Sequence, residues 1–213
     1  SISALCESTG ADIKEVAKSI GTDTRIGIKF LDAGPGFGGS CFKKDILNLV
    51  YLSKYYGLNE VSDYWEQVVK INIWQQKRIS KLIIKNLFGT LAGKRIAIFG
   101  FSFKANTNDT RESPSISISR DLLQEGAKLA FFDPQVEEGK ILGEFLDNTN
   151  KEDIEIASSA IEASKGADAV LILTEWKDFE YLEWESIFFN MRKPAWIFDT
   201  RAVSYTHLRA HET

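Results

Sequence analysis

The stretch KRIAIFGF, residues 94–101, decides the fold of this chain. Its β-branched and aromatic side chains form a short apolar run next to a glycine, which is typical of a buried strand. Ser113 and Pro114 then supply an N-cap and a first-turn proline for a helix that extends to about Glu125. The next apolar run, AKLAFFD at 127–133, predicts a second strand. A β-α-β unit with parallel strands follows.

The same alternation continues toward the C-terminus. The segments predicted there are a helix at 158–165, a strand at 167–174, an amphipathic segment at 179–191 and a strand at 194–201. Strands that alternate with helices build a Rossmann-like parallel sheet covered by helices. The fold class is therefore predicted to be α/β, with a helical segment followed by this sheet.

The first ninety residues carry helical periodicity instead. Apolar spacing predicts a helix over 1–20 that is broken near Gly10, a helix over 44–56 and a long helix over 62–88. The long helix is apolar on more than one face, so we expect it to be covered on both sides, as a spine between two parts of the molecule or against a second copy.

A glycine-flanked break near 89–93 gives the domain boundary. The predicted units are residues 1–90, residues 91–203 and an unassigned tail at 204–213, which holds both histidines. The chain also begins inside a periodic pattern with no helix cap before it. We therefore expect it to be part of a longer protein.

Composition excludes several classes of function. The net charge of −4 is spread over 26 basic and 30 acidic residues without blocks, so no stripe of cations is available for nucleic acid. No segment approaches the roughly 18 to 20 apolar residues that cross a bilayer, and the N-terminus does not look like a secretory signal. We expect a soluble, cytoplasmic protein without membrane partners. Two cysteines and two distant histidines predict neither a disulfide framework nor a zinc site, and no metal is expected.

The loop GPGFGGSCFKKD, residues 34–45, places a lone cysteine among glycines at the start of a predicted helix. A free cysteine is most often a small buried hydrophobe, and that is our interpretation of Cys6. Around Cys41, however, the helix start and the cations Lys43 and Lys44 favour a thiolate. The glycines would let a ligand approach the backbone closely. Cys41 is therefore the candidate nucleophile.

Asp45 follows Cys41 by four residues, which is one helical turn, so both side chains can face one cavity. An acidic residue in the first turn of a helix commonly serves only to complement the helix dipole. Beside a nucleophilic thiol it becomes a candidate for activating water or moving a proton.

A second motif, GFSFKANTNDTRES at 100–113, follows the first strand of the sheet. Ligands of open α/β sheets bind beyond the carboxyl ends of the strands. The GxGxxG fingerprint is missing, so a self-contained NAD site in this half is not expected. Lys104 and Arg111 instead offer cations for a phosphate, Phe103 offers a stacking face, and Arg201 ends the last strand at the same edge.

Taken together, GFGGSCFKKD (36–45), GFSFKANTNDTRESPS (100–115) and IFDTR (197–201) resemble the nucleotide-sugar dehydrogenases, especially those that oxidise UDP-glucose. The resemblance runs over residues 1 to about 203. It is specific, because three separated motifs occur in the family's order and with its spacing.

The resemblance implies a four-electron oxidation of the C6 alcohol of UDP-glucose to a carboxylate, with two molecules of NAD. In the family, the cysteine that matches Cys41 adds to the aldehyde-level intermediate, and oxidation then gives a thioester that water hydrolyses. Asp45 matches the aspartate that assists the water and proton steps.

The resemblance also assigns binding residues. Those that match the segment wrapping the substrate are Asp32, Ala33, Gly34, Pro35, Gly36, Phe37 and Gly38. Other substrate contacts match Phe103, Lys104 and Arg201, and Arg25 matches an arginine that reaches the nucleotide sugar of the neighbouring subunit. Residues that border or contact NAD match Cys41, Phe42, Lys43, Lys44 and Arg111.

In this family the NAD fingerprint and several residues used in the oxidation steps lie upstream of the matching region. The chain is therefore expected to be inactive alone, with residues 1–90 belonging to the helical domain that forms the dimer and 91–203 to the domain that covers the UDP-sugar. A homodimer, or a larger assembly of dimers, is implied.

Three alternatives stay open. The first is a dehydrogenase acting on GDP-mannose or a UDP-N-acetylsugar. The second is a UDP-sugar-binding or dimerisation module without redox activity. The third is a generic nucleotide-binding domain in which Cys41 is a buried structural thiol.

Overall fold

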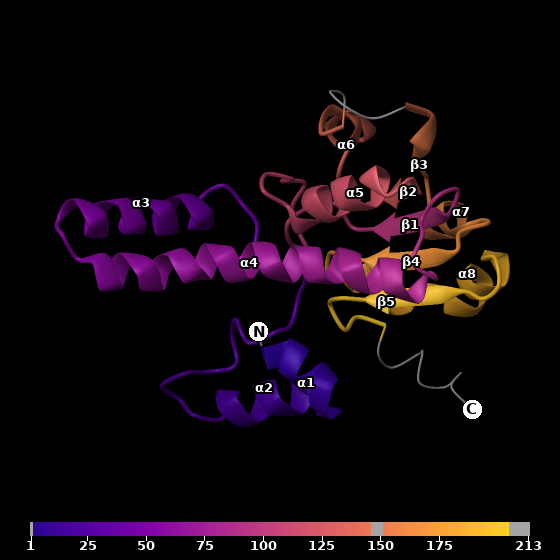
Figure 1. Cartoon of the computed structure of the whole chain (residues 1–213). Coiled ribbons are helices and arrows are strands. Elements are labelled where there is room, and N and C mark those ends of the chain that lie inside the picture. Colours follow the sequence, from indigo (N-terminus) through magenta and orange to yellow (C-terminus); the bar gives the residue numbers. More distant parts are fainter. Residues whose placement is uncertain (1, 146–150, 205–213) are drawn as a thin grey trace.

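The computed structural model describes residues 2–145 and 151–204, and Figure 1 shows a group of helices beside a sheet that is layered between helices. Residues 205–213 of the predicted tail, with both histidines, lie outside the described residues. Ser204, the first residue of that tail, is buried and donates from its hydroxyl to Asp199 at 2.7 Å. Ser204 thus packs with the sheet domain.

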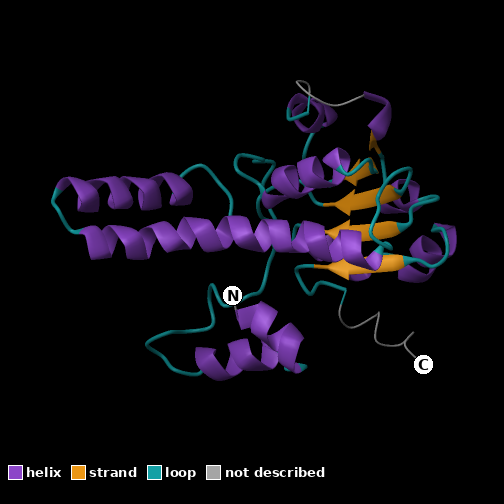
Figure 2. Cartoon of the chain, viewed as in Figure 1, coloured by secondary structure: helices purple, strands orange, loops and turns teal. Residues whose placement is uncertain are grey.

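The helical half contains four helices: α1 (Ile2–Thr9), α2 (Ile13–Gly21), α3 (Phe42–Tyr55) and α4 (Asn59–Asn86). Gly10 has a positive φ of 75°, which glycine adopts without strain, and it breaks the predicted first helix as expected. α3 and α4 pack side by side as a helical hairpin that projects beyond the sheet (Figure 2).

The sheet has five parallel strands in the order β3-β2-β1-β4-β5. The strands are β1 (Arg95–Phe99), β2 (Lys128–Phe132), β3 (Ile154–Ile156), β4 (Ala169–Ile172) and β5 (Trp196–Asp199). The α/β prediction is confirmed, and four of the strands coincide with predicted segments. The edge strand β3 was not predicted, because three residues carry too little alternation to be recognised.

Alternate side chains of each strand enter two separate cores. In β1, Ile96 and Ile98 pack with α4 and α5, whereas Ala97 and Phe99 pack on the other face with α7 and α8. The covering elements are α5 (Pro114–Gln124), α6 (Glu138–Gly143), α7 (Ala160–Ser164) and α8 (Trp184–Asn190), with short 3-10 turns at Lys151–Asp153 and Lys177–Tyr181. Both faces of the sheet are therefore buried, as parallel strands require.

Helix α4 joins the hairpin to the sheet. Its C-terminal half buries Ile79 and Ile83 in the core shared with α5, while its N-terminal half packs against α3. Its outer face is less covered than we predicted: Ile71, Ile73 and Trp74 each expose 44–45% of their surface. Within one chain, then, α4 is covered on one side only over this part of its length.

Candidate active site at the glycine-rich loop

The carboxyl ends of the strands gather the predicted loop residues at one edge of the sheet. The loop 100–113 follows β1, Glu175 lies just beyond β4, and Arg201 lies just beyond β5. The Arg201 guanidinium donates to the carbonyl oxygens of Leu173 at 2.9 Å and Phe103 at 3.5 Å. This is the edge at which open α/β sheets bind ligands.

Cys41 is exposed at the N-terminal end of α3, where its carbonyl oxygen accepts the Asp45 N–H at 2.9 Å. The thiol lies 3.6 Å from the Ser40 hydroxyl. Cys6 is the buried cysteine, with 5% of its surface exposed. The alternative in which Cys41 is a buried structural thiol is therefore wrong, and the position of Cys41 at a loop-to-helix junction is confirmed.

The glycines of the loop make room for the protein's own atoms. A Cβ on Gly36 would lie 2.6 Å from Oδ1 of Asn72, and one on Gly38 would lie 2.4 Å from the carbonyl oxygen of Glu112. At Gly34 a Cβ would approach the Arg201 guanidinium to 2.9 Å. The sequence alone predicts that these glycines leave space for a ligand. In the structure their close contacts are instead with α4 and the sheet domain.

Hydrogen bonds hold the loop on both sides. Toward α4, Phe37 N–H donates to Oδ1 of Asn72 at 2.8 Å and Nδ2 of Asn72 donates back to the Phe37 carbonyl at 3.0 Å. Gln75 donates to the Gly34 carbonyl at 3.0 Å. Toward the sheet, Gly39 N–H donates to the Arg111 carbonyl at 2.8 Å. The loop before Cys41 is thus fixed between two elements that are distant in sequence.

Positive charge lies around Cys41. Lys43 forms an ion pair with Glu112 at 2.8 Å, and Lys44 is exposed. Arg111 pairs with Asp109 at 2.7 Å while 68% of its side chain remains exposed. Hydrogen bonding to Asp109 raises the pKa of Arg111, and the nearby Cys41 adds a smaller effect in the same direction. A thiolate at Cys41 would therefore lie within the field of a cation.

Arg201 is largely buried, with 15% of its side chain exposed, and forms an ion pair with Glu175 at 3.1 Å. Burial lowers the pKa of Arg201, and the charges of Glu175 and Asp32 oppose that shift. Lys104 is exposed and its ammonium lies 5.3 Å from the Phe103 ring centre. The structure thus brings Asp32 and Phe103 close to Arg201, and the binding role of these residues and of Lys104 stays a prediction.

Two clefts flank the loop. One, of about 220 Å³, is lined by Phe37, Lys43, Asn72 and Glu112 among others. The other, of about 450 Å³, lies between α1, α4 and β5, and Gly34 is part of its wall. Cys41 and Asp45 line neither, so the predicted shared cavity for their side chains is not formed by these two clefts.

Arg25 stands apart from this group. Its guanidinium pairs with Asp23 at 2.6 Å, and 87% of its side chain is exposed. Hydrogen bonding to Asp23 raises the pKa of Arg25. Pro35, by contrast, is buried within the loop.

Sequence reasoning missed three polar residues that hold the site together: Asn72, Gln75 and Glu175. Asn72 and Gln75 are one turn apart on α4, among many other polar side chains of that helix, so the sequence does not single them out. Glu175 follows a buried strand at its carboxyl end, and that placement is a signal that the sequence contains.

The described residues contain no group of three or more His, Cys, Asp or Glu side chains that could hold a metal ion. Among them there is likewise no helix with the length and apolar character needed to cross a membrane.

Comparison with known proteins agrees with this geometry. Residues 1–74 match the model of the UDP-glucose/GDP-mannose dehydrogenase family, central domain, and residues 97–205 match that of the same family's UDP binding domain. The UDP-glucose 6-dehydrogenase of Caenorhabditis elegans is 49% identical over 207 residues, covering 95% of this chain and 43% of the relative. That of Gallus gallus is 52% identical over 209 residues, covering 95% and 42%.

Among solved structures, a UDP-glucose dehydrogenase from Pyrobaculum islandicum superposes with a TM-score of 0.78 at 28% identity, covering 92% of this chain and 41% of that one. The chain thus spans less than half the length of the curated relatives it matches. The family models alone cover most of its residues. The chain belongs to the UDP-glucose/GDP-mannose dehydrogenase family.

Proposed function

We propose that the protein containing this chain is an NAD-dependent UDP-glucose 6-dehydrogenase, which oxidises the C6 alcohol of UDP-glucose to the carboxylate of UDP-glucuronate. The observation that carries the proposal is the exposed Cys41 thiol at the start of α3, on a loop held against the carboxyl edge of the sheet. Relatives named UDP-glucose 6-dehydrogenase at 49–52% identity support the choice of sugar.

Cys41 is the proposed nucleophile. Its thiolate bonds to the aldehyde-level C6 carbon and gives a thiohemiacetal, which keeps the intermediate on the protein. Removal of hydride from that carbon gives a thioester. Water then attacks the thioester carbonyl, the C–S bond breaks, and the carboxylate leaves as Cys41 regains its thiolate. Asp45, exposed one turn along α3, accepts a proton from the attacking water.

Two molecules of NAD, bound in turn, would each accept one hydride of this four-electron oxidation. The residues proposed to border NAD are Cys41, Phe42, Lys43, Lys44 and Arg111. Their charge fits a pyrophosphate, because Arg111 and Lys44 are exposed cations. Arg111 would approach the phosphates with Asp109 already paired to it.

The UDP-sugar is proposed to bind along residues 32–38, with Phe103, Lys104 and Arg201 on the opposite side. Arg201 is held by Leu173 and Glu175, so its guanidinium is pre-positioned rather than free to search. Arg25 is proposed to reach the nucleotide sugar of a second copy, which agrees with its outward, exposed position.

We further propose that two copies pair through the helical half, residues 1–90, and that residues 91–203 form the UDP-sugar-binding domain. Large apolar side chains exposed on α3 and α4 support the pairing surface; they include Tyr51, Tyr55, Leu58, Tyr64, Ile71 and Trp74. The cytoplasmic location and the inactivity of the chain alone remain predictions from its sequence.

The test is NADH formation from UDP-glucose by the complete gene product that contains this segment. Cys41→Ser should reduce overall turnover to background while UDP-glucose binding persists, and the matched Cys6→Ser variant should keep activity. Normal turnover by Cys41→Ser would overturn the nucleophile. A higher kcat/KM with GDP-mannose or a UDP-N-acetylsugar would move the proposal to those substrates, and UDP binding with no NADH from any of these sugars would favour the binding-module alternative.

A further inference from the structure

We propose that Asn72 on α4 is a positioning residue that sets the place of Cys41 by clamping the loop at Phe37. Its importance for catalysis rests on the function proposed above. The positioning itself is a property of the chain that can be measured without turnover.

The clamp uses both ends of one carboxamide. Oδ1 accepts the Phe37 N–H at 2.8 Å, and Nδ2 donates to the Phe37 carbonyl at 3.0 Å, so the backbone of one residue is held from both sides. Gly36 stands next to this pair, and a Cβ there would lie 2.6 Å from Oδ1. The glycine before Phe37 therefore lets the carboxamide come close enough to form both bonds.

The clamp is connected to the thiol by short contacts. The Phe37 ring packs edge-on against the Phe42 ring with centres 4.8 Å apart, and Phe42 is the residue after Cys41. Two residues beyond Phe37, Gly39 N–H donates to the Arg111 carbonyl. Fixing Phe37 therefore restrains the segment that leads into α3 and its first turn.

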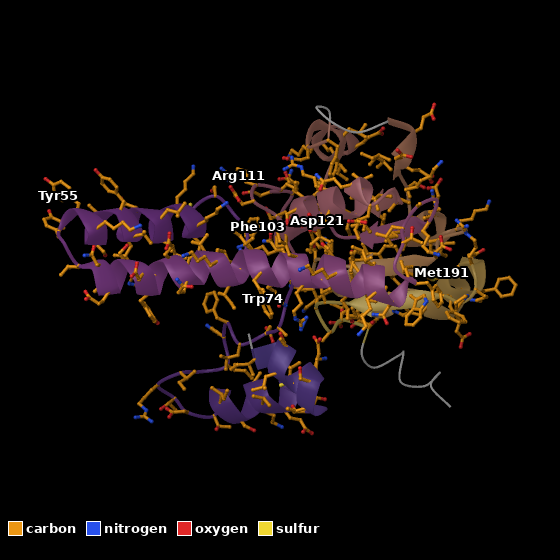
Figure 3. The ribbon with its side chains drawn as sticks, viewed as in Figure 1. Tyr55, Trp74, Phe103, Arg111, Asp121 and Met191 are labelled. Carbon is orange, nitrogen blue, oxygen red and sulfur yellow. The ribbon has the colours of Figure 1, made fainter. Side chains whose placement is uncertain are left out.

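The other end of the connection is the sheet. One turn along α4, Gln76 accepts a hydrogen bond from Ser117 of α5 at 2.7 Å, and Ser80 donates to Asp121 at 2.8 Å. In Figure 3 Phe103 and Asp121 lie on one side of α4, while Trp74 projects from the other. Asn72 thus ties the loop that carries the Cys41 thiol to α4, and α4 is itself anchored on the sheet domain.

Only a carboxamide of this length supplies a donor and an acceptor together. Asn72→Ala removes both hydrogen bonds. Asn72→Asp keeps the size and can accept from Phe37 N–H, but an ionised carboxylate faces the Phe37 carbonyl without a proton to donate. The pair of variants separates loss of the whole clamp from loss of one half of it.

The experiment uses the 213-residue chain and two readouts. Hydrogen exchange reports the opening of residues 36–41, and mass spectrometry of alkylated peptides gives the rate of the iodoacetamide reaction at Cys41, compared between variants at the same pH. Asn86→Ala is the matched control, because Asn86 is an exposed asparagine on the same helix that donates only to its own helix, at Leu82. Urea unfolding records stability for every variant.

For Asn72→Ala we expect amide exchange in residues 36–41 to rise by about tenfold or more, since two hydrogen bonds are lost. The rate of Cys41 alkylation at a given pH should change by about twofold or more, because the thiol loses its fixed place at the start of α3. Asn72→Asp should move both readouts in the same direction by less, and less still as pH falls toward carboxylate protonation.

A shift in urea stability with unchanged exchange at 36–41 and an unchanged rate of Cys41 alkylation would overturn the proposal and leave Asn72 a structural residue. If Asn72→Ala does not fold, Asn72→Asp decides by the same criteria. The outcome is independent of the proposed function, which fails instead if the complete protein forms no NADH from UDP-glucose or the alternative sugars.

Discussion

Arg201 is a cation held mostly out of water, with protein oxygens of Leu173, Phe103 and Glu175 around it. A buried cation is stable only if such partners replace its hydration. Removing it would leave the Leu173 carbonyl without the Arg201 N–H and Glu175 without its ion-pair partner. The proposed substrate contact and a structural role are therefore combined in one side chain.

We predict that Arg201→Ala lowers the free energy of unfolding by about 1–3 kcal/mol, less than for a fully buried pair because 40% of the Glu175 side chain is exposed. Urea unfolding measures the change. Arg192→Ala is the comparison, since Arg192 pairs with Asp168 but exposes 55% of its side chain; it should cost less than about 1 kcal/mol. Equal losses of unfolding free energy in the two variants would refute a special structural role for Arg201.

A residue whose chemistry is indicated by its neighbours in the chain could be predicted from the sequence. A residue whose role depends on a partner distant in the chain could not. Cys41 was recognisable because its neighbours in the chain are glycines and lysines. Asn72 is 35 positions from its partner Phe37, and no pattern in one sequence relates the two. The glycines were interpreted as ligand space for the same reason, since Asn72 and Glu112 become their neighbours only after folding.

At the scale of elements, an ion pair links the edge strand β3 to β1, which lies beyond β2 in the sheet. Both terminal guanidinium nitrogens of Arg95 on β1 donate to Glu155 of β3, at 2.6 and 2.9 Å. Hydrogen bonding to Arg95 lowers the pKa of Glu155 below its ordinary value. A folded-state pKa below the unfolded value means that this pair stabilises the fold above the unfolded pKa, about 4.3, and ceases to do so as pH falls through the folded one.

Glu155→Gln should therefore lower stability at neutral pH by less than about 1 kcal/mol, because half of the Glu155 side chain is exposed. The difference from the parent should shrink as pH falls below the unfolded pKa and disappear once the folded-state carboxylate is protonated. Urea unfolding at several pH values measures it, with Glu185→Gln as the control on an exposed part of α8. A difference that persisted in acid would rule out the charged pair as its source.

Helix α4 illustrates what periodicity leaves undecided. Its apolar pattern predicted a long helix, yet isoleucines of equal hydrophobicity have opposite surroundings. Ile83 is completely buried in the core with α5, and Ile71 exposes 44% of its surface. Which face would be buried depends on where the sheet packs, and that is a tertiary property.

Ile83→Ala should lower the free energy of unfolding by about 2–5 kcal/mol, through lost burial and the cavity left behind. Ile71→Ala, a chemically identical change on the same helix, should cost less than about 1 kcal/mol in the monomer. Urea unfolding at low protein concentration makes the comparison. A large loss at Ile71 under those conditions would mean that its face is covered within one chain.

At the scale of the whole molecule, α4 fastens the cysteine loop and the sheet domain to one rigid element. Asn72 and Gln75 hold the loop, while Ser80 and Ile83 hold α5 and the sheet. The strand pattern predicted this sheet because each long strand is a continuous apolar run. The relation between the halves could not be predicted, since it depends on side-chain contacts between distant segments.

The exposed apolar side chains at the far end of the hairpin indicate that α3 and α4 contact another protein surface. Tyr55 and Met191 lie toward opposite ends of the molecule in Figure 3, and the region near Tyr55 also exposes Leu58 and Tyr64 by 52% and 67%. Apolar groups gathered on one projecting hairpin favour burial against another protein surface. In the homodimer proposal, that surface belongs to a second copy of the chain.

Tyr64→Asp should then weaken pairing of the chain by about 100-fold or more, because an unpaired carboxylate buried at the interface costs roughly 3 kcal/mol. Sedimentation velocity across a dilution series measures the dissociation. Phe189→Asp is the matched control, since Phe189 is 85% exposed on α8, away from the hairpin. If Phe189→Asp separates the copies while Tyr64→Asp does not, the pairing surface lies on the sheet domain. A parent chain that stays monomeric at every concentration would instead rule out pairing through residues 1–90.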